Sequence, residues 1–232
     1  MKFTNKIKKV AALTLAVGMF ALCAPLAHAT LILTLKDNVT NQSITITDNL
    51  SGDVLGATGQ IGFSGGIGSW VALVTTGASN APGTASIALL DFSSIILTNT
   101  GAGSLTFTLT ETGFTNPAGP TSGASTGIGG TTNGTVTASS LFNGNSLINL
   151  GPFTGGPGGS FSGGGGSSVD TTNPFSLTNS VTVVYGAGGG SSTFAMSTSV
   201  PEPAMLGLLG LGLIGLGLAR RKSTRSQAST TV

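Results

Sequence analysis

The chain has 232 residues and a formal net charge of +2, and only 7% of its residues are charged, against about 25% in an average soluble domain. The bases gather at the two ends, whereas residues 30–199 hold one base, Lys36, and six acids, a net charge of −5. A mildly acidic middle segment without a basic patch excludes nucleic acid as an expected partner. The 38 glycines follow no strict three-residue period, which excludes a collagen-like chain.

Residues 1–29 have the pattern of a secretory signal peptide. A basic segment of residues 1–9 precedes an apolar run from Val10 to about Leu22, and the small residues Ala27 and Ala29 follow. Ala27 and Ala29 supply an A-x-A cleavage site, so the pattern predicts export and a cut after Ala29. The alternative is an uncut membrane anchor, for which the apolar run is short.

Residues 30–199 have the pattern of an all-β ectodomain. Five stretches alternate apolar and polar residues, as strands with one buried face do, and three short apolar runs have the composition of strands buried on both faces. Turn residues such as Asn49, Gly52 and Asn99 separate them, and no helical stripe is sustained. The spacing predicts an antiparallel β-sandwich or jelly roll. The alternating stretches are Leu31–Leu35, Ser43–Thr47, Ser104–Thr112, Val181–Tyr185 and Thr193–Met196, and the apolar runs are Trp70–Val74, Ile87–Leu90 and Ile95–Leu97.

Two segments of this region, residues 115–135 and 151–168, are rich in Gly, Pro, Ser and Thr. Ordering a glycine costs more backbone entropy than ordering any other residue, and four consecutive glycines at 163–166 offer no side chain to a core. We therefore expect mobile loops or a spacer here. The alternative is tight turns between strands.

Residues 200–232 have the pattern of a membrane-sorting segment. Val200-Pro201-Glu202-Pro203 precedes an uncharged apolar run over residues 204–219, which the bases Arg220, Arg221 and Lys222 follow. A helix of this length spans about 24 Å at ~1.5 Å per residue, slightly less than a ~30 Å hydrocarbon core, and local thinning can cover the difference. The sequence predicts a single transmembrane helix at 204–219 with a cytoplasmic C-terminus by the positive-inside rule.

This segment resembles the PEP-CTERM sorting signal. The resemblance rests on Val200, Pro201, Glu202 and Pro203, the Gly/Leu-rich apolar helix, and Arg220 and Arg221, in that order. It covers about the last thirty residues, and the tail from Lys222 to Val232 is longer than is usual in the family. The resemblance implies a Gram-negative host that makes extracellular polysaccharide, and processing at Pro-Glu-Pro by a membrane protease-transpeptidase called exosortase. The alternative is a plain C-terminal anchor.

The expected mature chain lacks the chemistry of common enzymes. The cut after Ala29 removes the only Cys and the only His, which leaves no Ser-His-Asp triad, Cys nucleophile or His/Cys zinc site. We therefore expect no catalytic residues, no enzyme activity and no cofactor. A surface hydrolase that uses two carboxylates, such as Asp91 and Glu111, is the remaining catalytic alternative.

Three acids are candidate calcium ligands. Asp37, Asp48 and Asp53 offer hard oxygen ligands close together in sequence, at the ends of two predicted strands. The alternative is ordinary turn chemistry, because Asp side chains commonly bind nearby backbone N–H groups in turns.

These features together predict an exported protein with three parts: a signal peptide (1–29), a β-rich ectodomain (30–199) and a sorting segment (200–232). Its expected partners are the secretion machinery, exosortase, the membrane and extracellular polysaccharide. The family resemblance implies a structural role at the cell surface, in a biofilm or polysaccharide matrix. The alternative is a carbohydrate- or partner-binding module that uses Trp70 and Tyr185, the only large amphipathic aromatic residues.

Overall fold

A computed structural model of the chain describes residues 30–81, 83–84, 87–117, 119–156, 158–172, 174–201 and 214. Six residues of the predicted targeting sites lie outside this range: Ala27, Ala29, Glu202, Pro203, Arg220 and Arg221. So do the predicted signal peptide and nearly all of the predicted helix at 204–219. Within the described residues, no helix has the length and apolar character needed to cross a membrane.

The described part of residues 30–201 is entirely β-structure and turns, as the sequence predicts. Twelve strands follow one another: β1 (Thr30–Asp37), β2 (Ser43–Thr47), β3 (Gln60–Ile67), β4 (Trp70–Ser79), β5 (Ile87–Asn99), β6 (Gly103–Phe114), β7 (Gly119–Thr132), β8 (Thr135–Phe142), β9 (Asn145–Thr154), β10 (Gly159–Thr171), β11 (Phe175–Tyr185) and β12 (Gly190–Pro201).

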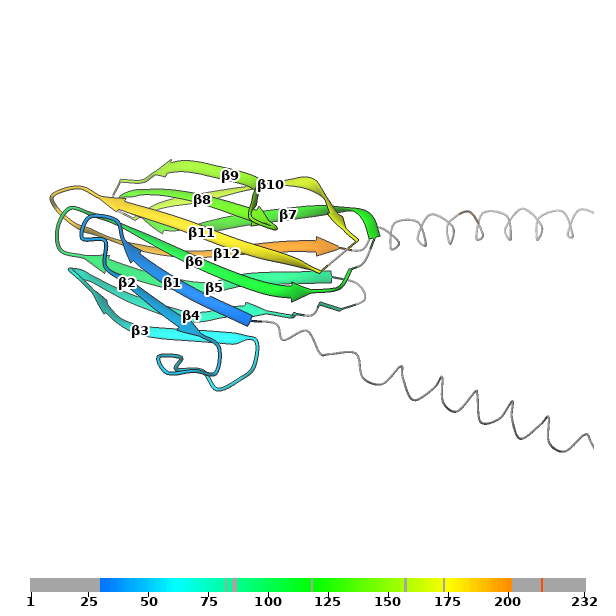
Figure 1. The fold of residues 1–232 in the computed structure, drawn as a ribbon. Helices are drawn as coiled ribbons and strands as arrows, with labels where there is room; N and C mark the ends of the chain where they lie inside the picture. The colour runs from blue at the N-terminus through cyan, green and yellow to red at the C-terminus, as the bar shows by residue number, and fades with distance from the viewer. Residues whose placement is uncertain are drawn as a thin grey trace, which may run out of the picture.

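The strands form two antiparallel sheets of six that pack face to face (Figure 1). The first sheet has the order β2-β1-β6-β11-β8-β9 and the second β10-β7-β12-β5-β4-β3. The predicted antiparallel β-sandwich is therefore confirmed. Thr30, where β1 begins, and Pro201, where β12 ends, lie at the same end of the sandwich (Figure 1); we call it the terminal end.

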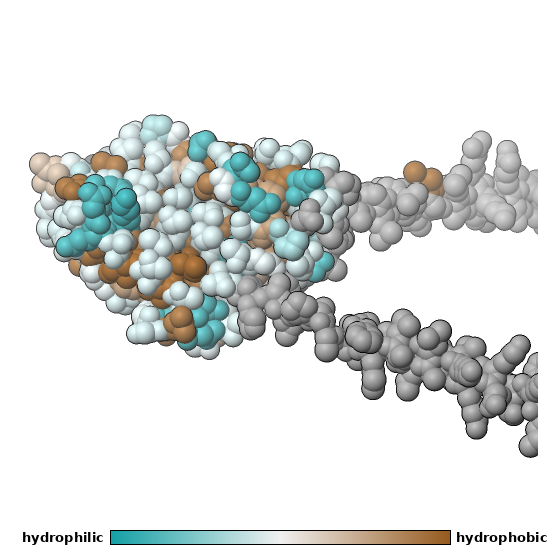
Figure 2. Space-filling view, viewed as in Figure 1, coloured by the Kyte–Doolittle hydropathy of each residue, from teal (hydrophilic) through white to brown (hydrophobic). Residues whose placement is uncertain are grey.

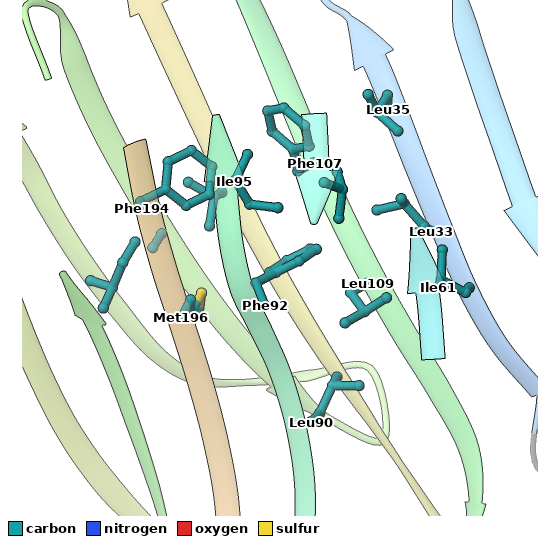
Figure 3. Packing of buried hydrophobic residues seen from close by; sticks show 14 of the residues in the cluster. Leu33, Leu35, Ile61, Leu90, Phe92, Ile95, Phe107, Leu109, Phe194 and Met196 are labelled. Carbon is teal, nitrogen blue, oxygen red and sulfur yellow. The ribbon is translucent and has the colours of Figure 1, made fainter. Parts of the chain in front are cut away.

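Large apolar side chains fill the space between the central strands (Figure 3). Leu33 of β1 and Phe107 of β6 come from the first sheet, and Phe92 of β5 and Met196 of β12 come from the second; all four are buried. The rings of Phe107 and Phe194 meet edge to face across the two sheets, with centroids 5.7 Å apart. Burying such side chains is the main force that holds the two sheets together.

A buried polar network crosses the core beside these side chains. Asn179 of β11 donates from Nδ2 to the carbonyl of Leu90 at 3.0 Å and accepts at Oδ1 from the Thr198 hydroxyl at 2.6 Å. The Thr198 hydroxyl also lies 2.9 Å from that of Thr126 and 3.0 Å from that of Ser140. The network joins strands of both sheets, and its hydrogen bonds offset the cost of burying these polar groups.

The apolar runs at 70–74, 87–90 and 95–97 lie in β4 and β5, but the prediction that both faces of these strands are buried is wrong. Val71, Leu73 and Ile96 are 62%, 38% and 43% exposed. They belong to the outer face of the second sheet, whereas Ala72, Val74 and Ile95 face the core. Leu73 and Ile96 are cross-strand partners, so each covers part of the other on a face that water reaches.

The prediction of loops at 115–135 and 151–168 is also wrong, because most of these residues form β7, the end of β9 and β10. The four glycines at 163–166 pair with residues 125–128 of β7. A Cβ at Gly163 would lie 2.6 Å from Cζ of Phe153, so the missing side chain provides the space that a ring of β9 fills. Backbone pairing, the space that the glycines leave for Phe153, and a few apolar side chains such as Ile128 and Val169 hold these strands in the fold.

The outer face of the first sheet carries rows of hydroxyl groups. Between β6 and β11, Thr106 and Thr182 lie 2.8 Å apart at their hydroxyls, and Thr110 and Thr178 lie 3.1 Å apart. Figure 2, viewed from this side, shows a surface that is largely of intermediate hydropathy, with separate hydrophilic and hydrophobic spots. This face is therefore polar but mostly uncharged.

Candidate functional site

The predicted sorting motif begins inside the last strand of the sandwich. Val200 is fully buried and pairs with Ala88 of β5, and Pro201 pairs with Ile87. The Ser122 hydroxyl of β7 donates to the carbonyl of Pro201. Neighbouring strands on both sides thus hold the first part of the motif, and Glu202 follows directly after the strand.

The three acids considered for calcium do not gather. Asp37 ends β1 and pairs with Leu105 near the start of β6, whereas Asp48 follows β2 and donates its N–H to the Leu31 carbonyl at 3.0 Å, near the start of β1. Asp37 and Asp48 therefore lie at opposite ends of the sandwich. The described residues contain no group of three or more His, Cys, Asp or Glu side chains placed to hold a metal ion. The three acids therefore do not form a single site, because the ends of β1 and β2, which are close in sequence, lie at opposite ends of the sandwich.

Asp37 and Asp53 instead organise turns, which was the alternative. Asp37 Oδ1 accepts from the N–H of Val39 at 2.9 Å and from that of Thr40 at 3.3 Å. Burial acts to raise the pKa of Asp37, but these hydrogen bonds outweigh it and hold the pKa below its usual value. Asp53 Oδ1 accepts from the N–H of Leu55 at 2.9 Å and from that of Gly62 at 3.0 Å, which fastens the β2–β3 loop to β3.

Glu111, one of the two carboxylates of the hydrolase alternative, lies in the interior and is 1% exposed. Its Oε1 accepts from the N–H of Thr112 at 3.0 Å. The Ser79 side chain and the Thr30 N–H lie close enough to the carboxylate to lower its pKa. Burial raises the pKa of Glu111 to about 7; these interactions oppose the rise, and the negative charge of Asp48 adds to it.

Asp48 lies beside this buried carboxylate. Its Oδ2 accepts from the N–H of Gly59 at 2.7 Å, whereas its Oδ1 is buried without a hydrogen-bond partner among the described residues. Gly59 has φ +79°, and a Cβ there would lie 2.8 Å from the carbonyl oxygen of Ser79, so only glycine fits easily. We call Thr30, Asp48, Ser79 and Glu111 the carboxylate site.

The sequence analysis missed this site, although a signal for part of it was present. Leu105, Phe107 and Leu109 alternate on the inward face of β6, and Glu111 is the next residue in that phase. Asn179 likewise stands in the inward phase of β11, between Leu177 and Val181. A polar residue in the apolar phase of a strand marks a buried polar site.

The two acids of the hydrolase alternative do not face one another. Asp91 lies on the outer face of the second sheet, between Leu90 and Phe92, which face the core, and it accepts a hydrogen bond from the Ser93 hydroxyl. Glu111 points into the interior. Paired carboxylates must flank one scissile bond in glycoside hydrolysis, and this arrangement does not place Asp91 and Glu111 across a shared cleft.

A hollow of about 420 Å³ lies between the β8–β9 hairpin and the end of β10. Phe142, Asn143, Ser146 and Val169 are among the residues that line it. Its described lining includes one carboxylate, Asp170, which accepts from the N–H of Thr172 at 2.9 Å. One carboxylate supplies half of the pair that glycoside hydrolysis needs.

The two large amphipathic aromatics are buried. Trp70 is 1% exposed and Tyr185 is 2% exposed, and their rings stack with centroids 5.3 Å apart. The Tyr185 hydroxyl donates to Ser192 Oγ at 2.7 Å. Neither ring forms a surface platform for a sugar, so the carbohydrate-binding alternative loses the residues on which it rested.

Solved structures that resemble the chain include the enzymatically active domain of bacteriophage CBA120 tailspike protein 4 (14% identity over 56% of this chain and 19% of that chain, TM-score 0.31). A family 35 carbohydrate-binding module from Clostridium thermocellum matches at 14% identity over 47% of this chain and 90% of the module, with a TM-score of 0.26. TmCBM61, solved with β-1,4-galactotriose, matches at 8% identity over 55% and 86%, with a TM-score of 0.27. Because these TM-scores and identities are low, no functional conclusion is drawn from the likeness.

No curated protein sequence matches the chain. One family model does match: the PEP-CTERM protein-sorting motif, over residues 199–222. The match begins in β12 and includes the Pro-Glu-Pro tripeptide, the apolar run and both arginines. The chain therefore carries a PEP-CTERM protein-sorting motif, which continues the last strand of an antiparallel β-sandwich.

Proposed function

We propose that this chain is an exported surface protein that an exosortase-type system sorts, and that its β-sandwich is a structural component of the extracellular polysaccharide matrix. The PEP-CTERM motif at residues 199–222 carries the proposal. In this proposal the signal peptide directs export, residues 204–219 span the inner membrane with the C-terminus in the cytoplasm, and processing at Pro201–Pro203 releases the sandwich to the cell surface of a Gram-negative bacterium.

The position of the motif supports this order of events. Because β12 ends at Pro201, the sandwich and the tripeptide are joined without a linker. The last strand, β12, pairs with β7 on one side and β5 on the other. A cut at or after Pro201 would therefore leave the fold intact. A sorting enzyme would act at the terminal end of the sandwich, from which the chain leaves toward the membrane.

The surface chemistry supports a structural role rather than a catalytic one, and we propose that the sandwich is not an enzyme. Rows of Thr and Ser hydroxyls on the outer faces, such as the Thr131–Thr193 pair at 2.9 Å, bind one another and water without charge. Sugar hydroxyls offer the same donor and acceptor chemistry. Such faces suit many weak contacts within a hydrated polysaccharide, where no single tight site is needed.

A specific carbohydrate- or partner-binding module is the second candidate, and the hollow beside Asp170 is the feature that favours it. Asn143 and Ser146 offer side-chain donors and acceptors there, and Phe142 offers an apolar wall. Asp170→Ala should abolish saturable binding of a purified host polysaccharide if this candidate is correct. Weak, non-saturating binding that is equal in the two proteins would support the structural role.

Intact-protein mass spectrometry tests the main proposal. The mature product is compared between the native host and the same host without exosortase. A product that ends near Pro201–Pro203 in the native host and keeps the full tail in the other supports it. A product that ends at Val232 in both hosts would reduce residues 204–219 to an ordinary anchor and remove the support for a matrix role.

A further inference from the structure

The carboxylate site surrounds the atom at which the predicted signal cleavage would act. Antiparallel pairing of β1 and β6 places Thr30 opposite Thr112 and Leu31 opposite Glu111. The backbone N–H of Thr30 therefore lies near the Glu111 carboxylate, and its interaction with that group lowers the pKa of Glu111. Asp48 lies next to the same strand start, because its own N–H binds the Leu31 carbonyl at 3.0 Å.

The two acids lack a positive partner in the described sandwich. Lys36 is the only basic residue between residues 30 and 201. It is exposed and lies six residues farther along β1, about 20 Å from Thr30 at ~3.3 Å per residue. Among the described residues, Asp48 is the charged group that acts on Glu111. Its negative charge disfavours the ionised form of Glu111. Within the part of the chain that the structure describes, the site therefore holds two neighbouring acids, one buried oxygen without a hydrogen-bond partner and no basic side chain.

Cleavage after Ala29 changes the charge at this position. Hydrolysis consumes one water: the Ala29–Thr30 C–N bond breaks, Ala29 leaves as a carboxylate, and the Thr30 nitrogen becomes an ammonium group. An amide N–H with one donor is replaced by a cation with three donors, at an atom that already lies near Glu111. The pKa of a free α-amino group is about 7.7–8.0, and a neighbouring carboxylate raises it further.

We propose that signal-peptide removal completes the fold of this protein: the new α-ammonium group of Thr30 forms a buried ion pair with Glu111 and supplies the missing donor to Asp48. A buried ion pair stabilises only when its charges are well hydrogen-bonded, because desolvation is costly. Here the backbone N–H groups of Thr112 and Gly59 and the Ser79 hydroxyl already hold the two carboxylates in place. In the precursor the Thr30 nitrogen is an uncharged amide, so the processed chain gains an ion pair that this atom does not form before cleavage.

The test compares three forms of the full mature chain, to Val232, in detergent. One begins at Thr30, one begins at Ala29, and one begins at Thr30 with an acetylated amino group. The Ala29 start moves the ammonium one residue away, and acetylation keeps the Thr30 N–H but removes its charge. Urea unfolding at pH 7 should give the Thr30 form an unfolding equilibrium constant lower by roughly tenfold or more, the equivalent of one pKa unit.

Glu111→Gln in all three forms is the matched control. It keeps the shape of the side chain and removes its charge, so the advantage of the Thr30 form should disappear. The carboxyl pKa of Glu111, followed by carbon-13 NMR, should fall by at least about one unit between the acetylated and free forms. Equal stability of the three forms, or an advantage that survives Glu111→Gln, would overturn the inference. So would a native exported product that starts elsewhere than Thr30, an outcome that leaves the sorting proposal standing.

Discussion

In the half of the sandwich built from β1, β4, β5, β6, β11 and β12, large apolar side chains of both sheets meet at the centre. In the half built from β7 to β10, side chains of the first sheet pack against glycines of the second sheet. Phe107 meets Phe194 in the first half, whereas Phe153 fills the space above Gly163 in the second. Phe153 also stacks on Phe161 across the two sheet edges, with centroids 5.1 Å apart.

The difference shows that a strand can be held in a fold in two ways. It can bring apolar side chains to the core, or its glycines can leave space for the side chains of another strand. β10 pairs with β7 along nearly its whole length although its centre has no side chains. Backbone hydrogen bonds are equally available to glycine. Where β9 lies over β10, the apolar area comes from Ile148 and Phe153 of β9, and the glycines of β10 supply the surface that these side chains cover.

The largest expected effect comes from removing a large side chain from the half built from β1, β4, β5, β6, β11 and β12, which we call the apolar half. Phe107→Ala should lower the free energy of unfolding by about 3–5 kcal/mol, because it removes a fully buried ring and leaves a cavity. Phe153→Ala removes a half-buried ring and should cost about 1–2 kcal/mol. Urea unfolding of the two variants measures both values. A cost at Phe153 equal to that at Phe107 would contradict the distinction between the halves.

The pH dependence of stability tests the role of Glu111, the buried carboxylate of the apolar half. In the full chain, where the Thr30 nitrogen is an uncharged amide, the pKa of Glu111 is raised from the ordinary value of 4.5 to about 7, and we expect the same in the acetylated Thr30 form. The stability that this group contributes is therefore complete below pH 4.5 and is lost as the pH rises through about 7, a change on the order of 3 kcal/mol. Unfolding curves between pH 4 and 8 measure it. Glu111→Gln should flatten the profile, and an unchanged profile would show that another group titrates.

A smaller effect is expected from adding a side chain to the half built from β7 to β10, which we call the glycine half. Gly163→Ala would place a Cβ 2.6 Å from the Phe153 ring, and overpacking of this kind should cost about 1–3 kcal/mol. Gly123→Ala, in the neighbouring β7, is the matched control, because a Cβ there has nothing within 4 Å. It should raise stability by about 0.5 kcal/mol by reducing the entropy of the unfolded chain. The comparison fails if both substitutions have the same sign.

The smallest effect is expected on the outer face of the apolar half. Val71 is 62% exposed, so Val71→Thr should change the free energy of unfolding by about 0.5 kcal/mol or less. Val74 of the same strand is fully buried, and Val74→Thr should cost about 1–3 kcal/mol, because it buries a hydroxyl. Thermal or urea unfolding distinguishes the two. A large loss at Val71 would mean that another surface covers this face.

The sequence predicted the apolar half well and the glycine half poorly. Alternation in Ser43–Thr47 and Ser104–Thr112 identified β2 and β6, because side chains of a half-buried strand alternate between core and water. β7 and β10 carry little apolar periodicity, and their composition resembles that of a linker. Their order depends on partners more than 30 residues away, such as Gly163 and Ile128, and a local pattern does not report such partners.

The two candidate sites also differ in how far the sequence alone predicts them. The sorting motif is a continuous segment that a protein recognises in sequence order, so its residues could be identified without the fold. The carboxylate site joins Thr30, Asp48, Ser79 and Glu111 from four separate parts of the chain. The pairing of β1 with both β2 and β6 brings three of them together, and the same topology separates Asp37 from Asp48.

By itself, the sequence determined the all-β class, the mild negative charge of the middle segment and the PEP-CTERM motif, because composition, alternation and a short contiguous motif are local properties. Only the tertiary structure decided that Trp70 and Tyr185 are buried, that glycine-rich segments form strands, and that Glu111 faces Thr30. These outcomes depend on strand pairing and on the space between two sheets. Both arise from contacts between residues distant in sequence, and only the folded chain brings those residues together.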